Sequence, residues 1–233
     1  MPASRSGSTM NAPVTIDAVE GVFASHGLFY RGGFKPAPGT LDVVLGTVIL
    51  IGNAGSAMWT SFQADPIVQD GRPNSLNRWI EKVVGSAADT LGARPVYAHD
   101  GPPFIPFLTW AAQCDAVSPS PLGLFVHPDF GLWHAYRAAL LFVASLNLPA
   151  SDQRRSPCET CPDRPCTTAC RVPGNDLVRD HVQGCAGSGL PEGQDCSRHG
   201  CGSRRACPVG RDYLYEPAHM RFHMDAFLRS GGL

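Results

Sequence analysis

The sequence predicts an α+β fold in which a sheet is covered by helices, followed by a small cysteine-rich part. A β-branched apolar run at residues 41–51 predicts a strand, and a long amphipathic pattern at residues 75–91 predicts a helix. Eight of the nine cysteines lie within residues 158–207, which sets the last third of the chain apart from the rest.

The composition is that of a folded protein with no strong charge bias. Of the 233 residues, 43% are apolar and 17% are charged, which is enough for a buried core in one or two domains. The formal net charge of -1 gives no reason to expect a nucleic acid partner. No apolar run approaches the roughly 18 residues of a membrane span, and the first residues lack the apolar core of a secretory signal. We therefore expect a cytoplasmic protein with no membrane partner.

The composition also divides the chain into three parts. Residues 1–13 are small and polar and predict a flexible leader. Residues 14–150 predict the α+β domain, which ends at a polar segment bounded by prolines, residues 149–157. Residues 151–233 then form a cysteine-rich domain with a helix at its carboxyl end.

The first predicted elements are a helix and a strand. Apolar residues recur at helical spacing from residue 16 to Gly27, which predicts a helix. The run at residues 41–51 is too apolar to alternate and predicts a central strand. The glycine-rich residues 52–55 that follow predict a tight turn. They do not predict a nucleotide-binding loop, because the G-x-G-x-x-G pattern and a Lys-Ser or Lys-Thr pair are missing.

The most clearly marked helix is predicted at residues 75–91. Asn74 or Ser75 can cap its start, and Gly92 can end it. Its apolar face consists of Leu76, Ile80, Val83, Ala87 and Leu91. This face predicts packing of the helix against the sheet.

The remaining predicted elements are shorter. Residues 95–98 predict a strand, and the proline-rich residues 99–114 lead into a short apolar helix. Two further strands are predicted at residues 122–127 and 138–144, on either side of a loop at residues 128–131.

The clustered cysteines form two runs with one cysteine between them. In chain order they are Cys158, Cys161, Cys166 and Cys170, then Cys185, then Cys196, Cys201 and Cys207. Bacterial ferredoxins use the run C-x2-C-x2-C-x3-C-P, in which three cysteines bind one cluster and the fourth binds the other. Two intervals here, of four and five residues, are longer than in that run, but such insertions in loops are tolerated. Eight ligands predict two [4Fe-4S] clusters and an electron-transfer function.

Two other readings of the cysteines remain open. Zinc ribbons usually contain two C-x2-C pairs, and only Cys158 and Cys161 have that spacing. A disulfide framework is disfavoured in a reducing cytoplasm. Cys114 stands apart in an apolar segment, and we expect it to be a buried core thiol.

The cysteine region resembles the double-cluster region of epoxyqueuosine reductase and related ferredoxin-like proteins. The resemblance rests on the segments CETCPDRPCTTAC and DCSRHGCGSRRACPVG, with the GC pair at Cys185 between them. It implies that the first cluster is bound by Cys158, Cys161, Cys166 and Cys207. It implies that the second is bound by Cys170, Cys185, Cys196 and Cys201. The sequence lacks the G-W-I-G-K-N-type stretch associated with epoxyqueuosine reductase, so no substrate and no catalytic residue are assigned.

A second resemblance concerns the first part of the chain. The segment FVHPDFGLWHAYRAALLF resembles the H-P-x-F-G-x-W-x-x-x-R segment of the cobalamin-processing protein of the nitroreductase-like class. It implies a nitroreductase-like domain with a cobalamin pocket at or near His127, Phe130, Trp133 and Arg137. Arg137 would hold an anionic group of a substrate or thiol.

Each of these four residues also has a structural interpretation. Phe130 and Trp133 can be core residues, His127 can bond within its own turn, and Arg137 can pair with Asp129. Near the carboxyl end, His219 and His223 are four residues apart. Without a third ligand, this spacing favours a docking helix over a metal site.

The sequence therefore supports one favoured function and two alternatives. In the first, two [4Fe-4S] clusters pass electrons to a pocket whose cofactor is a corrinoid, as in a cobalamin-dependent reductase. Its partners would be a redox protein or a small-molecule substrate. The alternatives are a plain ferredoxin-type carrier without a second cofactor and a structural zinc protein.

Overall fold

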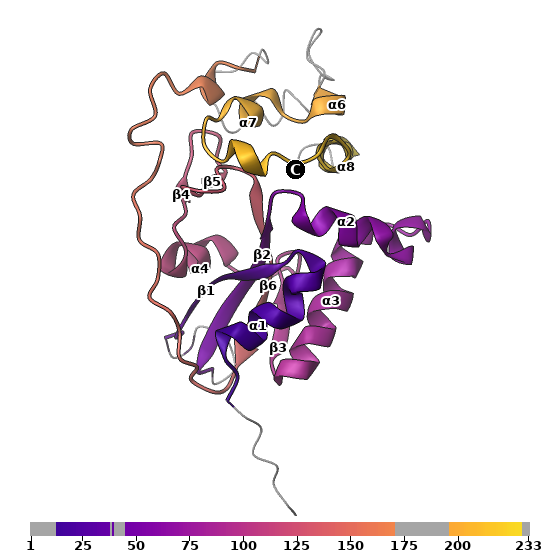
Figure 1. Cartoon of the computed structure of the whole chain (residues 1–233), viewed down its shortest axis with the longest axis vertical. Helices are drawn as coiled ribbons and strands as arrows, with labels where there is room; N and C mark the ends of the chain where they lie inside the picture. Colours follow the sequence, from indigo (N-terminus) through magenta and orange to yellow (C-terminus); the bar gives the residue numbers. More distant parts are fainter. Residues whose placement is uncertain (1–12, 38, 40–44, 171–195, 230–233) are drawn as a thin grey trace, which may run out of the picture.

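The computed structural model describes residues 13–37, 39, 45–170 and 196–229 (Figure 1). Its centre is a four-stranded antiparallel sheet with the order β1-β2-β6-β3. The strands are β1 (Phe29–Phe34), β2 (Thr47–Ala54), β3 (Arg94–Tyr97) and β6 (His134–Phe142). The predicted α+β class, with a sheet covered by helices, is confirmed.

Strand β2 is the predicted central strand, and every residue in it is buried. The part of the prediction at residues 41–44 lies outside the described residues. The strand leads into a turn at Gly55, whose φ of 57° places it in the left-handed region, as the glycine-rich sequence predicted.

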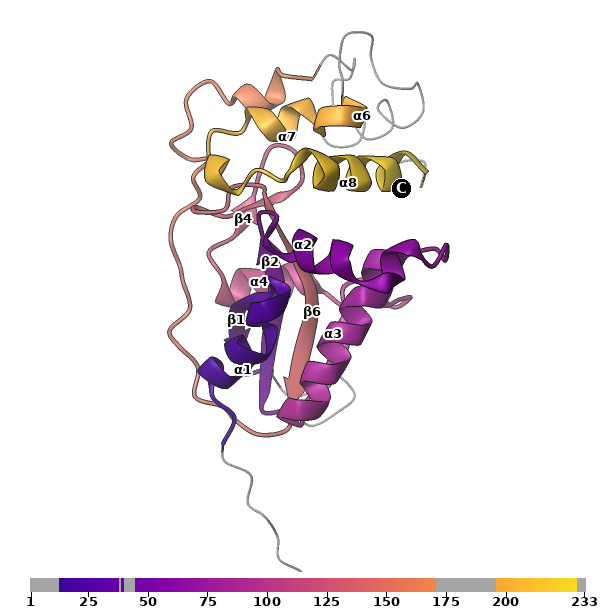
Figure 2. The same cartoon turned by 45° about the vertical axis from the view of Figure 1, so that its right-hand side comes forward.

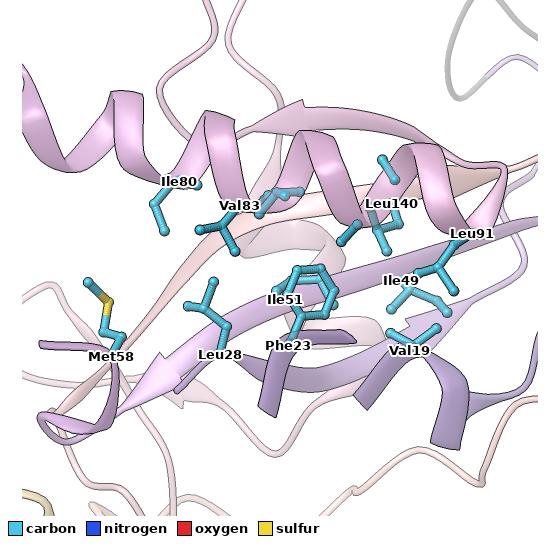
Figure 3. Close-up of a cluster of buried hydrophobic side chains, with 14 of the residues drawn as sticks. Val19, Phe23, Leu28, Ile49, Ile51, Met58, Ile80, Val83, Leu91 and Leu140 are labelled. Atoms are coloured by element: carbon cyan, nitrogen blue, oxygen red, sulfur yellow. The ribbon is translucent and has the colours of Figure 1, made fainter. Parts of the chain in front are cut away.

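Helices cover both faces of the sheet (Figures 1 and 2). On one face lie α1 (Ile16–Phe23) and α3 (Ser75–Leu91), and on the other lies α4 (Phe107–Cys114). Figure 3 shows the apolar side chains of α1, α3 and β2 meeting in one core. All five residues predicted on the face of α3 belong to it. Burial of each large aliphatic side chain contributes roughly 1.5–3 kcal/mol, so this packing stabilises the helix far more than its propensity does.

Several shorter elements connect this framework. They are η1 (Ala24–His26), α2 (Ala57–Ala64), η2 (Pro66–Gln69), β4 (Ser118–Pro119) and β5 (Phe125–Val126). The predicted first helix is therefore an α-helix to Phe23 followed by a 3-10 turn, which ends at Gly27 with a φ of 64°.

Two strand predictions were wrong in their bounds. The strand predicted at residues 122–127 is reduced to Phe125–Val126, because its flanking residues belong to turns. The strand predicted at residues 138–144 begins at His134, because its polar first half pairs with the end of β2.

The cysteine-containing segments lie at the end of the sheet where β2 ends and β6 begins (Figures 1 and 2). They contain η3 (Pro165–Thr167), α6 (Cys196–His199), α7 (Gly202–Ala206), η4 (Arg211–Tyr213) and α8 (Pro217–Arg229). Helix α8 packs on α2 through Phe222, which contacts Trp59 and Phe62. In the described part of the chain, no helix combines the length and the apolar character that crossing a membrane requires.

Candidate functional site

A cavity of about 640 Å³ lies between the sheet and the cysteine-containing segments. Its walls come from the start of β6, the start of α4, the loop before β5, and from α7 and α8. Its lining residues are Ala98, Ile105, Pro106, Phe107, Leu108, Thr109, Leu124, Phe125, Leu132, His134, Ala135, Tyr136, Arg137, Arg204, Tyr215 and His223. Leu108 and Leu124 are about half exposed (51% and 46%), so the cavity reaches the surface at an apolar rim.

Two arginines give the cavity a positive charge. Arg137 donates from Nε to Oδ1 of Asn53 at 2.9 Å, and Arg204 donates from Nε to the Leu132 carbonyl oxygen at 2.9 Å. Burial lowers the pKa of the Arg137 guanidinium, but arginine stays protonated in proteins. Among the described residues that line the cavity there is no carboxylate. Since a buried cation without a counter-ion is unfavourable, the cavity is suited to an anionic group.

Behind the cavity wall lies a buried polar network centred on Asp115. Its carboxylate accepts hydrogen bonds from Arg31 at 2.7 Å and from the Tyr136 hydroxyl at 2.6 Å. Arg31 also contacts Nδ1 of His134 at 3.3 Å, and Nε2 of His134 lies 3.1 Å from the Phe125 carbonyl oxygen. Because arginine can only donate and a carbonyl can only accept, His134 carries its proton on Nε2.

The charge state of His134 follows from the same network. Burial, together with the charge of Arg31, lowers the pKa of His134 to about 3. Its imidazole is therefore neutral at pH 7. The network holds His134 and Tyr136 in fixed orientations in the cavity wall.

His127 and Phe130, two of the residues expected at the pocket, belong to this network and do not line the cavity. Nδ1 of His127 accepts from the amides of Asp129 at 3.0 Å and Phe130 at 3.3 Å. Its Nε2 lies 3.3 Å from Asp115, and its ring stacks on Phe130 at 4.2 Å. His127 thus organises its own turn, as its structural interpretation predicted.

Trp133 and Arg137 take different positions. Arg137 lines the cavity, whereas Trp133 is buried behind Arg204, whose guanidinium lies 4.4 Å from the Trp133 ring centre. Nε1 of Trp133 is a buried donor with no hydrogen-bond partner among the described residues. The predicted pairing of Arg137 with Asp129 was wrong, because Asp129 pairs with Arg154 at 2.6 Å.

The described cysteines of the two runs fall into two groups by their electrostatic contacts. Burial raises the pKa of Cys166, and the thiols of Cys207, Cys158 and Cys161 raise it further. Burial likewise raises the pKa of Cys207, against a hydrogen bond from the Val209 amide, and Cys158 and Cys161 add to the rise. Of these four residues, Cys207 and Cys158 also pack in one apolar cluster.

The second group surrounds Cys201. Burial raises the pKa of its thiol, hydrogen bonds from the amides of Arg204 and Ser203 lower it, and Cys196 and Cys170 raise it. Ser203 is itself buried, and its hydroxyl has no partner in the described part of the chain.

None of the eight cysteines in the described residues forms a disulfide. Cys185 lies outside the described residues. Within the described ranges, no three cysteine, histidine or acidic side chains are placed closely enough to hold a single metal ion. Cys114 is the last residue of α4 and is buried in the core, and burial raises its pKa to about 12, as expected of an inert core thiol.

Sequence reasoning missed most of the cavity. Arg204, Tyr215 and His223 come from the carboxyl-terminal segments, and His134 and Tyr136 were not singled out. The HPDFGLWHAYR segment contains the last two, but strand alternation from Arg137 would not have identified them, because residues 134 to 137 all line the cavity. For Arg204 no local pattern gives a signal.

Comparison with known proteins gives a match only at the level of structure. No family model matches the chain, and no curated protein sequence matches it. The solved structure of a C. elegans B12-trafficking protein, CblC, described as a homologue of human MMACHC, is similar with a TM-score of 0.56. The chains are 13% identical, and the match covers 93% of this chain and 95% of the other. This chain shares that fold. The predicted resemblance to the cobalamin-processing class is thereby confirmed for the fold.

Proposed function

We propose that this protein carries two [4Fe-4S] clusters and passes electrons from them to a ligand bound in the cavity, as a cytoplasmic reductase. One observation carries the proposal. Cys207 and Cys158 pack in one apolar cluster with Leu132, and Leu132 also lines the cavity. A cluster bound at these thiols would therefore lie directly behind the cavity wall.

The proposed ligand sets follow the two groups of thiols. The first cluster takes Cys158, Cys161, Cys166 and Cys207, whose mutual electrostatic contacts support this set. The second takes Cys170, Cys185, Cys196 and Cys201, and the contacts of Cys201 with Cys196 and Cys170 support the described part of it. Each set draws on both cysteine runs, as ferredoxin-type ligation does.

The surroundings of the thiols fit clusters as well. Hydrogen bonds from backbone amides to cluster sulfur stabilise the more negative, reduced state. The amides of Val209, Arg204 and Ser203 already point to cysteine sulfurs. The buried Ser203 hydroxyl is a further donor without a partner in the described chain, and a cluster sulfur would supply one.

A corrinoid is the proposed cofactor of the cavity. The similar structure is titled a B12-trafficking protein, and the cavity volume lies in the usual range for small-molecule sites. A corrinoid is larger than most ligands of such sites, so it would fill the cavity and extend over Leu108 and Leu124. Arg137 and Arg204 would hold an anionic group. When bound, the corrinoid would supply a metal centre that accepts single electrons.

Metal analysis of anaerobically purified protein tests the proposal. We expect about eight irons and about eight acid-labile sulfides per chain, because four thiolates bind each of two clusters. Stoichiometric zinc without sulfide would show the structural zinc protein instead. Titration with hydroxocobalamin should give a saturable change in its absorbance bands. If the protein holds clusters but the absorbance of hydroxocobalamin does not change, the protein would be a ferredoxin-type carrier instead.

A further inference from the structure

A chain of hydrogen bonds runs from the protein surface through α8 to the cavity. Oγ of Ser56 lies 3.1 Å from Nδ1 of His219, and Nε2 of His219 lies 3.1 Å from Nε2 of His223. His223 lines the cavity, while Ser56 is partly exposed. The hydrogen bond to His219 uses Nε2 of His223, so the other ring nitrogen, Nδ1, is left for a further partner.

Aromatic stacking fixes the central imidazole. His219 is fully buried between Trp59, at 4.7 Å with an interplanar angle of 9°, and Tyr215, at 3.9 Å and 12°. Its ring cannot tilt out of this stack unless one of the two neighbouring rings moves. The two hydrogen bonds of His219 are therefore held in place by packing.

The hydrogen-bond partners are compatible with an arrangement of the protons that points toward the cavity. Oγ of Ser56 already accepts from the Glu216 amide at 2.8 Å, so its own proton is available for Nδ1 of His219. His219 then carries its proton on Nε2 and donates it to Nε2 of His223. His223 in turn carries its proton on Nδ1, which leaves a donor for a ligand in the cavity.

Both imidazoles are neutral. Burial lowers the pKa of His219 to about 3 and that of His223 to about 2, and the charges of Arg137 and Arg204 contribute to both shifts. These arginines, from β6 and α7, are the charged residues that line the cavity. Since an imidazolium is disfavoured here, a proton can pass only if each ring gains one as it loses one.

We propose that Ser56, His219 and His223 form a proton relay that delivers a solvent proton to a basic atom of the ligand in the cavity. His223 is the catalytic residue, and His219 and Ser56 are positioning residues. The Nδ1 proton of His223 moves to the ligand, the Nε2 proton of His219 moves to His223, the Ser56 proton moves to His219, and water restores Ser56. No net charge remains on the relay. This inference rests on the proposed function, because a ligand that gains an electron from a cluster becomes more basic.

Nitrogen NMR of the ring nitrogens tests the relay independently of any reaction. In the oxidised protein, both histidines should stay neutral down to about pH 4, with the proton on Nε2 of His219 and on Nδ1 of His223. A charged His223 at neutral pH, or a proton on Nδ1 of His219, would overturn the relay even if the protein proves to hold no cluster.

A kinetic experiment uses hydroxocobalamin as the probe and dithionite as the reductant. The experiment is run at alkaline pH, where the probe carries hydroxide and its reduction by one electron also consumes one proton to release water. We expect His223→Gln to slow it at least tenfold and to abolish the solvent deuterium isotope effect. His219→Phe, which keeps the ring stack, should do the same. The surface variant His99→Gln is the matched control and should react as the wild type does.

The outcomes separate the relay from the proposed function. Oxidation of the reduced clusters by ferricyanide needs no proton and should be unchanged in every variant. An unchanged rate and isotope effect in His223→Gln would overturn the relay while leaving the proposed function intact. Wild-type protein without clusters would overturn the proposed function, and the NMR result would then decide the relay.

Discussion

The backbones of Gly131 and Gly210 lie in direct contact where the sheet domain meets the cysteine-containing segments. A Cβ atom on Gly131 would lie 2.0 Å from the Val209 carbonyl oxygen, and one on Gly210 would lie 2.2 Å from the Phe130 carbonyl carbon. Both glycines also have positive φ angles, 57° and 71°. This contact joins the turn that contains Gly131 to the loop that follows Cys207. It therefore fixes the position of the cysteine-containing segments relative to the sheet.

Replacing Gly210 with alanine should therefore destabilise the protein strongly. Gly71→Ala is a matched control, because Gly71 has a φ of 70° and nothing within 4 Å of its Cβ position. The control should lose about 1–2 kcal/mol of unfolding free energy from backbone strain alone. Gly210→Ala should lose at least about 2 kcal/mol more, because backbone atoms must move. Urea unfolding measures both, and equal losses would show that the contact tolerates a side chain.

The elements that could be predicted from the sequence are those with a strong local pattern. Strand β2 is marked by an unbroken apolar run, and α3 is marked by apolar residues that repeat with the helical period. Strand β1 gave no such signal, since its sequence FYRGGF contains two adjacent glycines and a buried arginine. The start of β6 mixes polar and apolar residues, and its residues 134 to 137 all line the cavity.

The site was less predictable than the fold for a physical reason. Arg137 was found because it lies in a recognisable segment, but its neighbour Arg204 reaches the cavity from a distant part of the chain. His127 was expected at the pocket from that same segment, yet its ring nitrogens are used by Asp129, Phe130 and Asp115. Only tertiary packing decides which side chains of a segment face a cavity.

Asp115 should control the acid stability of the protein. Burial raises the pKa of this carboxyl, but hydrogen bonds from His127 and Tyr136 and the charge of Arg31 bring it below its usual range. A carboxyl with a depressed folded-state pKa stabilises the fold above its unfolded pKa of about 3.9, and this contribution is lost as the pH falls below that value.

We expect Asp115→Asn to lose about 3–5 kcal/mol of unfolding free energy at pH 7, because it leaves the Arg31 cation buried without a counter-ion. The difference from the wild type should shrink as the pH falls below about 4. Unfolding by urea at several pH values measures this. Asp70→Asn, which breaks the more exposed pair with Arg78, is the control and should lose less. A difference that stays constant with pH would show that the Asp115 carboxylate is not its source.

The positive charge of the cavity should give it affinity for anions. Inorganic phosphate is a simple probe, and calorimetric titration measures its binding. Arg137→Met should weaken binding at least about tenfold, equal to roughly 1.4 kcal/mol, because Arg137 has no carboxylate partner among the described residues. Arg221→Met removes the same charge from an exposed position on α8 and should change binding little. Equal effects of the two variants would mean that phosphate responds only to the overall charge.

The assignment of thiols to clusters makes a prediction that single serine variants can test. Cys207→Ser and Cys158→Ser should lose the same electron paramagnetic resonance signal of the reduced protein, because the two residues share an apolar cluster and Cys158 raises the pKa of Cys207. Cys201→Ser should lose the other signal, since Cys196 and Cys170 raise the pKa of its thiol. Cys114→Ser is the control and should keep both signals, because this thiol bonds to the Trp110 carbonyl in the core, away from both groups.

The assignment would be wrong if Cys207→Ser and Cys201→Ser lost the same signal while Cys158→Ser lost the other one. The clusters would then not draw their ligands from both runs in the way proposed.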